Sequence, residues 1–220
     1  MARTHRLSIA CFTGTPLALA LTDDATVCDD SGMNVDWHAD LTEHLRAAEA
    51  MATHLPLLAT IADRITYCLQ NDGTLYLCGN GGSAADCQHV AGEFVGRFLR
   101  ERRPLPAVAL TTDTSILTAV GNDYGYDQIF SRQVTALARA KDIVAGISTS
   151  GNSPSILKAI ASARANGAFT IGFTGEKENA LGGLCDITFR APSLQTPRVQ
   201  EMHLFAWHLI CDKVEAAFCV

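Results

Sequence analysis

Short apolar runs alternate with amphipathic helical patterns from residue 74 to the C-terminus. In the helical segments the apolar residues recur every three or four positions, the spacing of a helix that is buried on one face. Such alternation predicts an α/β fold, with a parallel sheet covered by helices on both faces. The strands are expected at residues 75–78, 107–110, 143–147, 170–173 and 187–190. The helices are expected at residues 84–98, 115–121, 128–138, 154–166, 178–181 and 197–218.

A separate helical pattern runs from residue 35 to residue 69, with apolar residues again at three- and four-residue steps. Pro56 is expected to divide it into two helices, because proline inside a helix removes a hydrogen bond. The second helix is expected to end at Asn71-Asp72-Gly73, since glycine is a common C-terminal stop. These helices pack either on their own sheet or against another subunit, and the sequence leaves both open.

The first 33 residues differ from the rest. Arg3 and Arg6 precede a mildly apolar run, and Ala18-Leu19-Ala20 resembles a signal-peptide cleavage site. An acidic, turn-prone stretch follows at residues 23–30. We predict a disordered extension, or a start assigned upstream of a true start at Met33, with an export signal as the alternative. Residues 34–220 are expected to form a single domain with an N-terminal helical segment.

The composition narrows the class of protein. Hydrophobic residues make up 48% and charged residues 18%, which is typical of a globular protein with a sizeable core. A net charge of −6 argues against nucleic acid and anionic membranes as partners. The eight cysteines lack CxxC spacing and several lie in apolar runs, which favours reduced thiols and a cytoplasmic location. No apolar run reaches the roughly 20 residues that span a bilayer.

A glycine-rich turn, Gly79-Asn80-Gly81-Gly82-Ser83, connects the first expected strand to the first expected helix of the α/β region. Glycines allow backbone amides to converge on an anion, and the following helix presents its N-terminus to the same point. The stretch matches neither the dinucleotide fingerprint nor the Walker loop. An ordinary turn between strand and helix is the alternative.

A second cradle follows the expected strand 143–147. The segment Ser148-Thr149-Ser150-Gly151-Asn152-Ser153 supplies four hydroxyl groups beside a glycine, and Pro154 suits the first position of a helix. Ser153 is a good N-cap residue, but capping alone does not explain the whole run. Hydroxyls, amides and a helix N-terminus together suit a phosphate monoester. Two cradles at the carboxyl ends of parallel strands favour a phosphorylated sugar as ligand.

Five ordered segments resemble a known family: CGNGGSAAD, HVAGE, GNDYGY, ISTSGNS and RVQEMHLFAWH. They are similar to the sugar isomerase (SIS) family, and most closely to its phosphoheptose isomerases. The resemblance runs from about Asp36 to the C-terminus. It implies a flavodoxin-like three-layer αβα sandwich with a five-stranded parallel sheet. It also implies a homotetramer whose active sites lie between subunits.

Acid/base residues are placed at helical spacing. His89 and Glu93 are four residues apart and share one side of a helix. Gln200 and His208 share a broad face of the last expected helix. Two histidines with a carboxylate are a common zinc ligand set. The resemblance implies one Zn²⁺ ion per subunit, held by His89, Glu93, Gln200 and His208.

The resemblance also implies a reaction, the conversion of D-sedoheptulose 7-phosphate into D-glycero-D-manno-heptose 7-phosphate through an enediol. This is an early step of ADP- and GDP-heptose biosynthesis. Glu93 is expected to take the carbon proton and His208 to move a proton between oxygens. Whether zinc is catalytic, structural or inhibitory is left open, and capping of a helix is an alternative role for Asp113. The expected substrate contacts are Asn80, Gly81, Gly82, Ser83, Glu93, Asp113, Ser148, Thr149, Ser150, Ser153 and Gln200.

Two other functions remain compatible with these motifs. One relative of the family is a scaffold that binds the bacterial replication initiator without isomerase chemistry. Met202-His203-Leu204 resembles the helix of that scaffold, but Glu93 and His208 are both present here, which favours an enzyme. The other alternative is an isomerase of a pentose or hexose phosphate.

Overall fold

The computed structural model describes residues 26–28 and 34–219. The chain divides into two compact units, residues 1–41 and 42–220. In the first unit strand β1 (Thr26–Cys28) pairs antiparallel with β2 (Asn34–Asp36), and helix α1 (Trp37–Ala50) begins. The prediction of a disordered extension or an upstream start concerns residues that, apart from β1, lie outside the described part of the chain.

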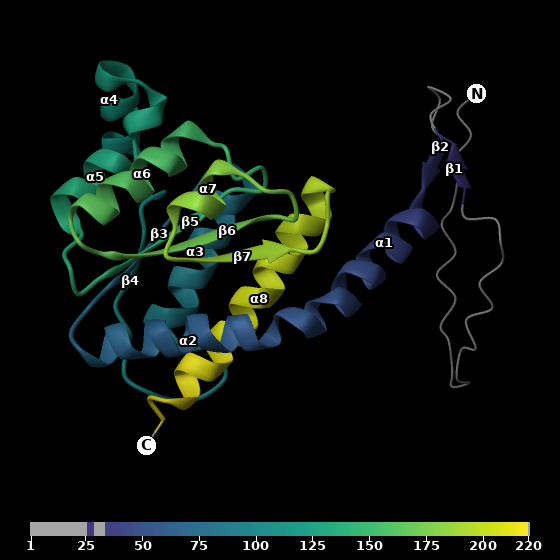
Figure 1. The fold of residues 1–220 in the computed structure, drawn as a ribbon, viewed down its shortest axis with the longest axis horizontal. Coiled ribbons are helices and arrows are strands. Elements are labelled where there is room, and N and C mark those ends of the chain that lie inside the picture. The colour runs from purple at the N-terminus through teal and green to yellow at the C-terminus, as the bar shows by residue number, and fades with distance from the viewer. Residues whose placement is uncertain (1–25, 29–33, 220) are drawn as a thin grey trace, which may run out of the picture. The chain divides into compact units, whose positions relative to one another are not determined.

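A five-stranded parallel sheet with the order β4-β3-β5-β6-β7 forms the centre of the second unit (Figure 1). The predicted five-stranded α/β fold is confirmed. The order places the switch point of the sheet between β3 and β5, and ligands of such sheets bind outside the carboxyl ends of the strands at this point. The strands are β3 (Leu75–Gly79), β4 (Ala107–Ala109), β5 (Ile143–Ile147), β6 (Phe169–Gly175) and β7 (Ile187–Ala191).

Helices cover both faces of this sheet (Figure 1). Strand β5 shows why two layers are required: Ile143 and Ala145 are buried in one core, and Val144 is buried in the other. Alternate side chains of a strand point to opposite faces, so an apolar strand needs cover on both sides. One layer contains α2 (Leu55–Gln70), α3 (Gly82–Val95) and α8 (Thr196–Ala216). The other contains α5 (Ser131–Leu137), α6 (Pro154–Ala165) and α7 (Ala180–Leu184).

The N-terminal helical segment is divided as predicted. A 3₁₀ turn, Met51–His54, separates α1 from α2, and Pro56 lies in the first turn of α2, where its missing N–H leaves no bond unmade. The apolar stripe of α2, including Ile61 and Ile65, is buried in the core shared with α8. This helix therefore packs within its own domain.

Several helices differ in length from the prediction. The helix expected to reach Phe98 ends at Val95, because the N–H groups beyond Gly96 turn away to a side chain of α8. A 3₁₀ turn, Tyr126–Gln128, replaces the start of the helix expected from residue 128. Helix α4 (Thr114–Tyr124) is longer than expected and has no buried residue. Within the described part of the chain, no helix has both the length and the apolar character required to cross a membrane.

Candidate active site

The glycine-rich turn joins the end of β3 to the start of α3 at the switch point of the sheet. Gly81 has a φ of 56°, in the left-handed region where a side chain would be strained, and α3 begins at the next residue. The amide of Asn80 is held on both sides: its Nδ2 donates to Ser155 Oγ at 2.9 Å and its Oδ1 accepts from the Tyr126 hydroxyl at 3.0 Å. Asn80 thus braces the turn against the neighbouring loop and helix.

The serine-rich loop follows β5 and leads into α6. The Oγ atoms of Ser148 and Ser153 lie 3.0 Å apart, and those of Ser148 and Ser150 lie 3.5 Å apart. Ser153 occupies the predicted N-cap position, but its hydroxyl makes no cap bond. The expectation that this hydroxyl caps α6 is therefore wrong, because Ser148 holds it within the loop. Three hydroxyl groups thus converge beside the N-terminus of a twelve-residue helix.

A cavity of about 340 Å³ opens beside this loop. Thr149 and Ser150 line one side, and Lys177 and Asn179 from the loop after β6 line another. Gly151 has a φ of 65°, and a Cβ on it would lie 2.1 Å from Asn179 Cγ, so only glycine lets the two loops meet this closely. Lys177 and Asn179 were not predicted from the sequence, because they belong to neither loop motif and reach the cavity only through the fold.

The predicted acid/base residues meet between α3 and α8. His89 Nε2 lies 2.9 Å from His208 Nε2 and 3.4 Å from Glu93 Oε1. The His208 ring also stacks on Phe98, with 5.4 Å between the ring centroids. Helices α3 and α8 pack against each other, so residues separated by more than a hundred positions become neighbours.

The protonation of His208 follows from this setting. Partial burial and the neighbouring His89 lower the pKa of His208, while Glu93 acts in the opposite direction. The net direction is downward from the ordinary value of 6.5, so the neutral imidazole is favoured near pH 7. A neutral imidazole is able both to accept and to donate a proton.

Gln200 and Asp113 are held by other contacts. Gln200 lies over the glycine turn: a Cβ on Gly82 would be 2.4 Å from its Nε2. It precedes His208 by two helical turns, about 12 Å along α8. Asp113 is the N-cap of α4, and its Oδ1 accepts from the Ile116 N–H at 2.9 Å. The capping role that competed with substrate binding for Asp113 is thus present in the structure.

The sequence profile of the SIS domain matches residues 36–175. The chain belongs to the SIS-domain family. The predicted resemblance is confirmed, and the matched residues contain strands β3 to β6 and the two loops at the carboxyl ends of β3 and β5.

Several similar proteins of the SIS family are phosphoheptose isomerases. The chain is 53% identical over 164 residues to the phosphoheptose isomerase of Rhodospirillum rubrum, covering 74% of this chain and 87% of the relative. Among solved structures, that of the phosphoheptose isomerase from Francisella tularensis has a TM-score of 0.79 and 37% identity, covering 82% of this chain and 96% of that one. The enzyme from Neisseria gonorrhoeae has a TM-score of 0.77 and 40% identity, with coverage of 82% and 97%.

Proposed function

We propose that this protein is an aldose–ketose isomerase that converts D-sedoheptulose 7-phosphate into D-glycero-D-manno-heptose 7-phosphate. The observation that carries the proposal is the meeting of the Glu93, His89 and His208 side chains between α3 and α8. It is supported by 53% identity to a phosphoheptose isomerase across most of both chains. The product would enter ADP- or GDP-heptose biosynthesis.

Phosphate binding is assigned to the serine-rich loop. The hydroxyls of Ser150 and Ser153 each lie within 3.5 Å of the Ser148 hydroxyl, so a phosphate oxygen placed among them exchanges one set of hydrogen bonds for another. Thr149 lines the adjoining cavity, and the N-terminus of α6 adds the positive end of its dipole. Lys177 lines the same cavity, together with the carboxylates of Glu176 and Glu178.

Proton transfer is assigned to Glu93 and His208. The Glu93 carboxylate removes a proton from C1 of the ketose, the C1–C2 double bond of the enediol forms, and the proton returns to C2. Meanwhile the neutral His208 imidazole passes a proton from O1 to O2, which turns the C2 carbonyl into a hydroxyl and C1 into the aldehyde. General acid–base groups must lie within hydrogen-bond reach of the atoms they serve. The assignment is supported by the contacts of His89, whose Nε2 lies 3.4 Å from Glu93 Oε1 and 2.9 Å from His208 Nε2.

The side chains of His89, His208 and Glu93 are of the chemical types that bind zinc. Two imidazole nitrogens and a carboxylate oxygen are common zinc ligands, and the ion when bound would polarise the substrate oxygens. The two Nε2 atoms are 2.9 Å apart and hydrogen-bonded, whereas ligands at about 2.0–2.1 Å from a tetrahedral zinc stand roughly 3.3 Å apart. Accordingly, no group of three such side chains among the described residues is spaced for a metal as it stands. His89, Glu93 and His208 would hold such an ion, and Gln200 remains a predicted fourth ligand.

Assembly and location complete the proposal. The cavity beside the serine-rich loop is lined by neither Glu93 nor His208, which supports a homotetramer whose sites combine residues of neighbouring subunits. The exposed apolar side chains of Val95, Leu99 and Tyr124 are available for such contacts. A reducing, cytoplasmic location is supported by free thiols at Cys68, Cys78, Cys87, Cys185, Cys211 and Cys219.

The decisive experiment is turnover of D-sedoheptulose 7-phosphate, measured with and without added zinc and followed by NMR of the product. We expect the manno-heptose 7-phosphate. No turnover in either condition would refute the isomerase and leave the scaffold role, while turnover of only a pentose or hexose phosphate would assign a different substrate.

Variants test the two proton-transfer groups. Glu93→Gln and His208→Ala are each expected to lower kcat by about two to four orders of magnitude, because each removes a general acid–base group. His44→Ala serves as the control, since it removes an imidazole that pairs with Glu201 at the surface. An unchanged kcat in either of the first two variants would remove that residue from the mechanism. Metal analysis of the purified protein should give about one zinc per chain, and less in His89→Ala.

A further inference from the structure

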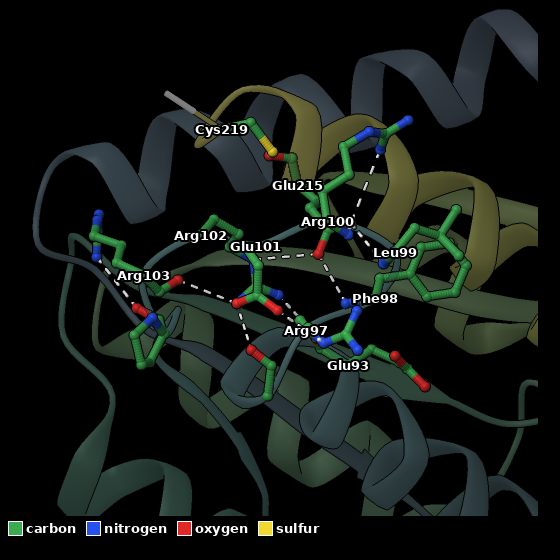
Figure 2. A network of polar contacts seen from close by, with 12 residues as sticks. Glu93, Arg97, Phe98, Leu99, Arg100, Glu101, Arg102, Arg103, Glu215 and Cys219 are labelled. Carbon is green, nitrogen blue, oxygen red and sulfur yellow. Dashed lines mark hydrogen bonds and ion pairs between the residues drawn. The ribbon is translucent and has the colours of Figure 1, made fainter.

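A buried ion pair lies beside the proposed active site. Arg102, in the loop that follows α3, and Glu215, near the end of α8, face each other with 3.5 Å between Nε and Oε1 (Figure 2). The side chain of each is only 1% exposed. Burying two charges costs free energy unless each charge makes further hydrogen bonds. The other hydrogen-bond partners of Arg102 and Glu215 therefore identify the segments that this ion pair holds in place.

The Glu215 side chain binds the backbone of the loop that follows α3. Its two carboxylate oxygens accept hydrogen bonds from three successive N–H groups, those of Phe98, Leu99 and Arg100, at 2.7 to 2.8 Å (Figure 2). Burial raises the pKa of Glu215, but these N–H donors and Arg102 outweigh it, and the pKa lies below its ordinary value. The carboxylate is therefore ionised and able to hold all three groups near neutral pH.

Arg102 holds the end of α3 itself. Its Nη2 donates to the Glu93 carbonyl oxygen at 2.7 Å, and its Nη1 donates to the carbonyls of Gly96 at 2.8 Å and Arg103 at 3.1 Å. The last carbonyls of a helix lack partners within the helix, and a cation there is favourable. The guanidinium thus closes the C-terminal turn of the helix that carries Glu93.

The same pair reaches both proposed proton-transfer residues. Arg102 binds the main chain of Glu93 directly. Glu215 binds the main chain of Phe98, whose ring stacks on the His208 imidazole. Glu215 also follows His208 by seven residues, so both side chains lie on one face of α8.

We propose that Arg102 and Glu215 are positioning residues for the isomerisation. Through the loop that follows α3, they align Glu93 on α3 with His208 on α8. This inference rests on the proposed function. Arg102 sets the end of α3, and Glu215 sets the ring that packs on His208. Neither residue is assigned a contact with the substrate.

The test compares Arg102→Met and Glu215→Gln with a matched control, Asp212→Asn. Asp212 pairs with Arg100, so it also joins α8 to the same loop, but both side chains of that pair are 46% exposed. We expect kcat to fall at least ten-fold in the first two variants, and the KM for sedoheptulose 7-phosphate to stay within about three-fold, because the serine-rich loop is not touched by the pair. The control should keep kcat within two-fold.

Two further measurements separate positioning from simple stability. Rates are measured per folded molecule, below the melting transition that circular dichroism gives for each variant. Arg102→Lys keeps the charge but loses the planar fork that joins three carbonyls, so it should stay slow even where its melting temperature recovers. If Arg102→Met does not fold, Glu215→Gln decides, because it keeps the side-chain volume and one acceptor oxygen.

The outcomes are distinct. A kcat per folded molecule that matches the control in Glu215→Gln and Arg102→Lys would overturn the positioning role, as would a loss confined to KM. An inactive wild-type protein would instead refute the proposed function, and this inference with it.

Discussion

Gly82, the first residue of α3, offers a test of Gln200 that leaves Gln200 itself unchanged. A Cβ on Gly82 would lie 2.4 Å from Gln200 Nε2 and 3.0 Å from its Cδ. Ordinary contacts begin at 3.4 Å, so in Gly82→Ala the Gln200 amide must retreat by about 1 Å. The backbone at Gly82 has no positive φ, and alanine is a better helix former than glycine by up to about 1 kcal/mol. The substitution should therefore displace one amide without lowering the stability of the fold.

The expected effect is on catalysis. Displacing a positioning group by about 1 Å can cost up to roughly 10²-fold in rate. We therefore expect kcat/KM for sedoheptulose 7-phosphate to fall about 10- to 100-fold, which is about 1.4–2.7 kcal/mol of transition-state stabilisation. The assay is steady-state isomerisation combined with a thermal melt. Gly183→Ala on α7 is the control, because a Cβ there would meet nothing within 4 Å.

A kcat/KM within two-fold of wild type in Gly82→Ala would show that the position of the Gln200 amide does not matter. Gln200 would then be neither a substrate contact nor a zinc ligand. A large drop in melting temperature would instead show that the contact between α3 and α8 at this position is structural.

Three further predictions concern stability. Gly151→Ala should lower the free energy of unfolding by about 1–3 kcal/mol, because it forces a side chain into a positive φ and against Asn179; an unchanged melt would contradict this. Asp113→Ala should cost about 1 kcal/mol through the lost cap, whereas Asp113→Asn should keep stability and activity; a ten-fold loss of kcat/KM in Asp113→Asn would show a sugar contact. Burial lowers the pKa of His203 to about 4 in the fold, against about 6.5 in the unfolded chain, so the unfolded state binds more protons between these values. The contribution of the neutral His203 to the free energy of unfolding is therefore present above pH 6.5, and roughly 3 kcal/mol of it should be lost as the pH drops to 4. Denaturant titrations at several pH values should show this loss in the wild-type protein but not in His203→Gln. The same pH dependence in both proteins would contradict the prediction.

The local sequence pattern was sufficient to predict most of the strands and helices. The five strands and their helices follow from short-range periodicity, which depends only on neighbours along the chain. The spacing of His89 and Glu93 likewise places both on one side of a helix without knowledge of the fold. The glycine at residue 81 and the proline at residue 56 mark a turn and a helix start for the same local reason.

The hydrogen-bond partners of individual side chains were harder to predict from the sequence. The expected N-cap role of the Ser153 hydroxyl is local and plausible, yet Ser148 holds this group instead. Residues 84–98 read as one helix because their apolar positions keep the right period. The helix nevertheless ends at Val95, since Glu215, more than a hundred residues away, takes the next N–H groups.

The sequence by itself determined the order of strands and helices along the chain, the positions of the glycine-rich and serine-rich loops, and the residues that share one face of α3 and of α8. Only the tertiary structure decided which of these residues meet. His208 reaches His89, Gln200 reaches the glycine turn, and Arg102 pairs with Glu215. The physical reason is that periodicity states which face of a helix is buried, whereas the identity of the partner depends on how two distant helices are packed against one sheet.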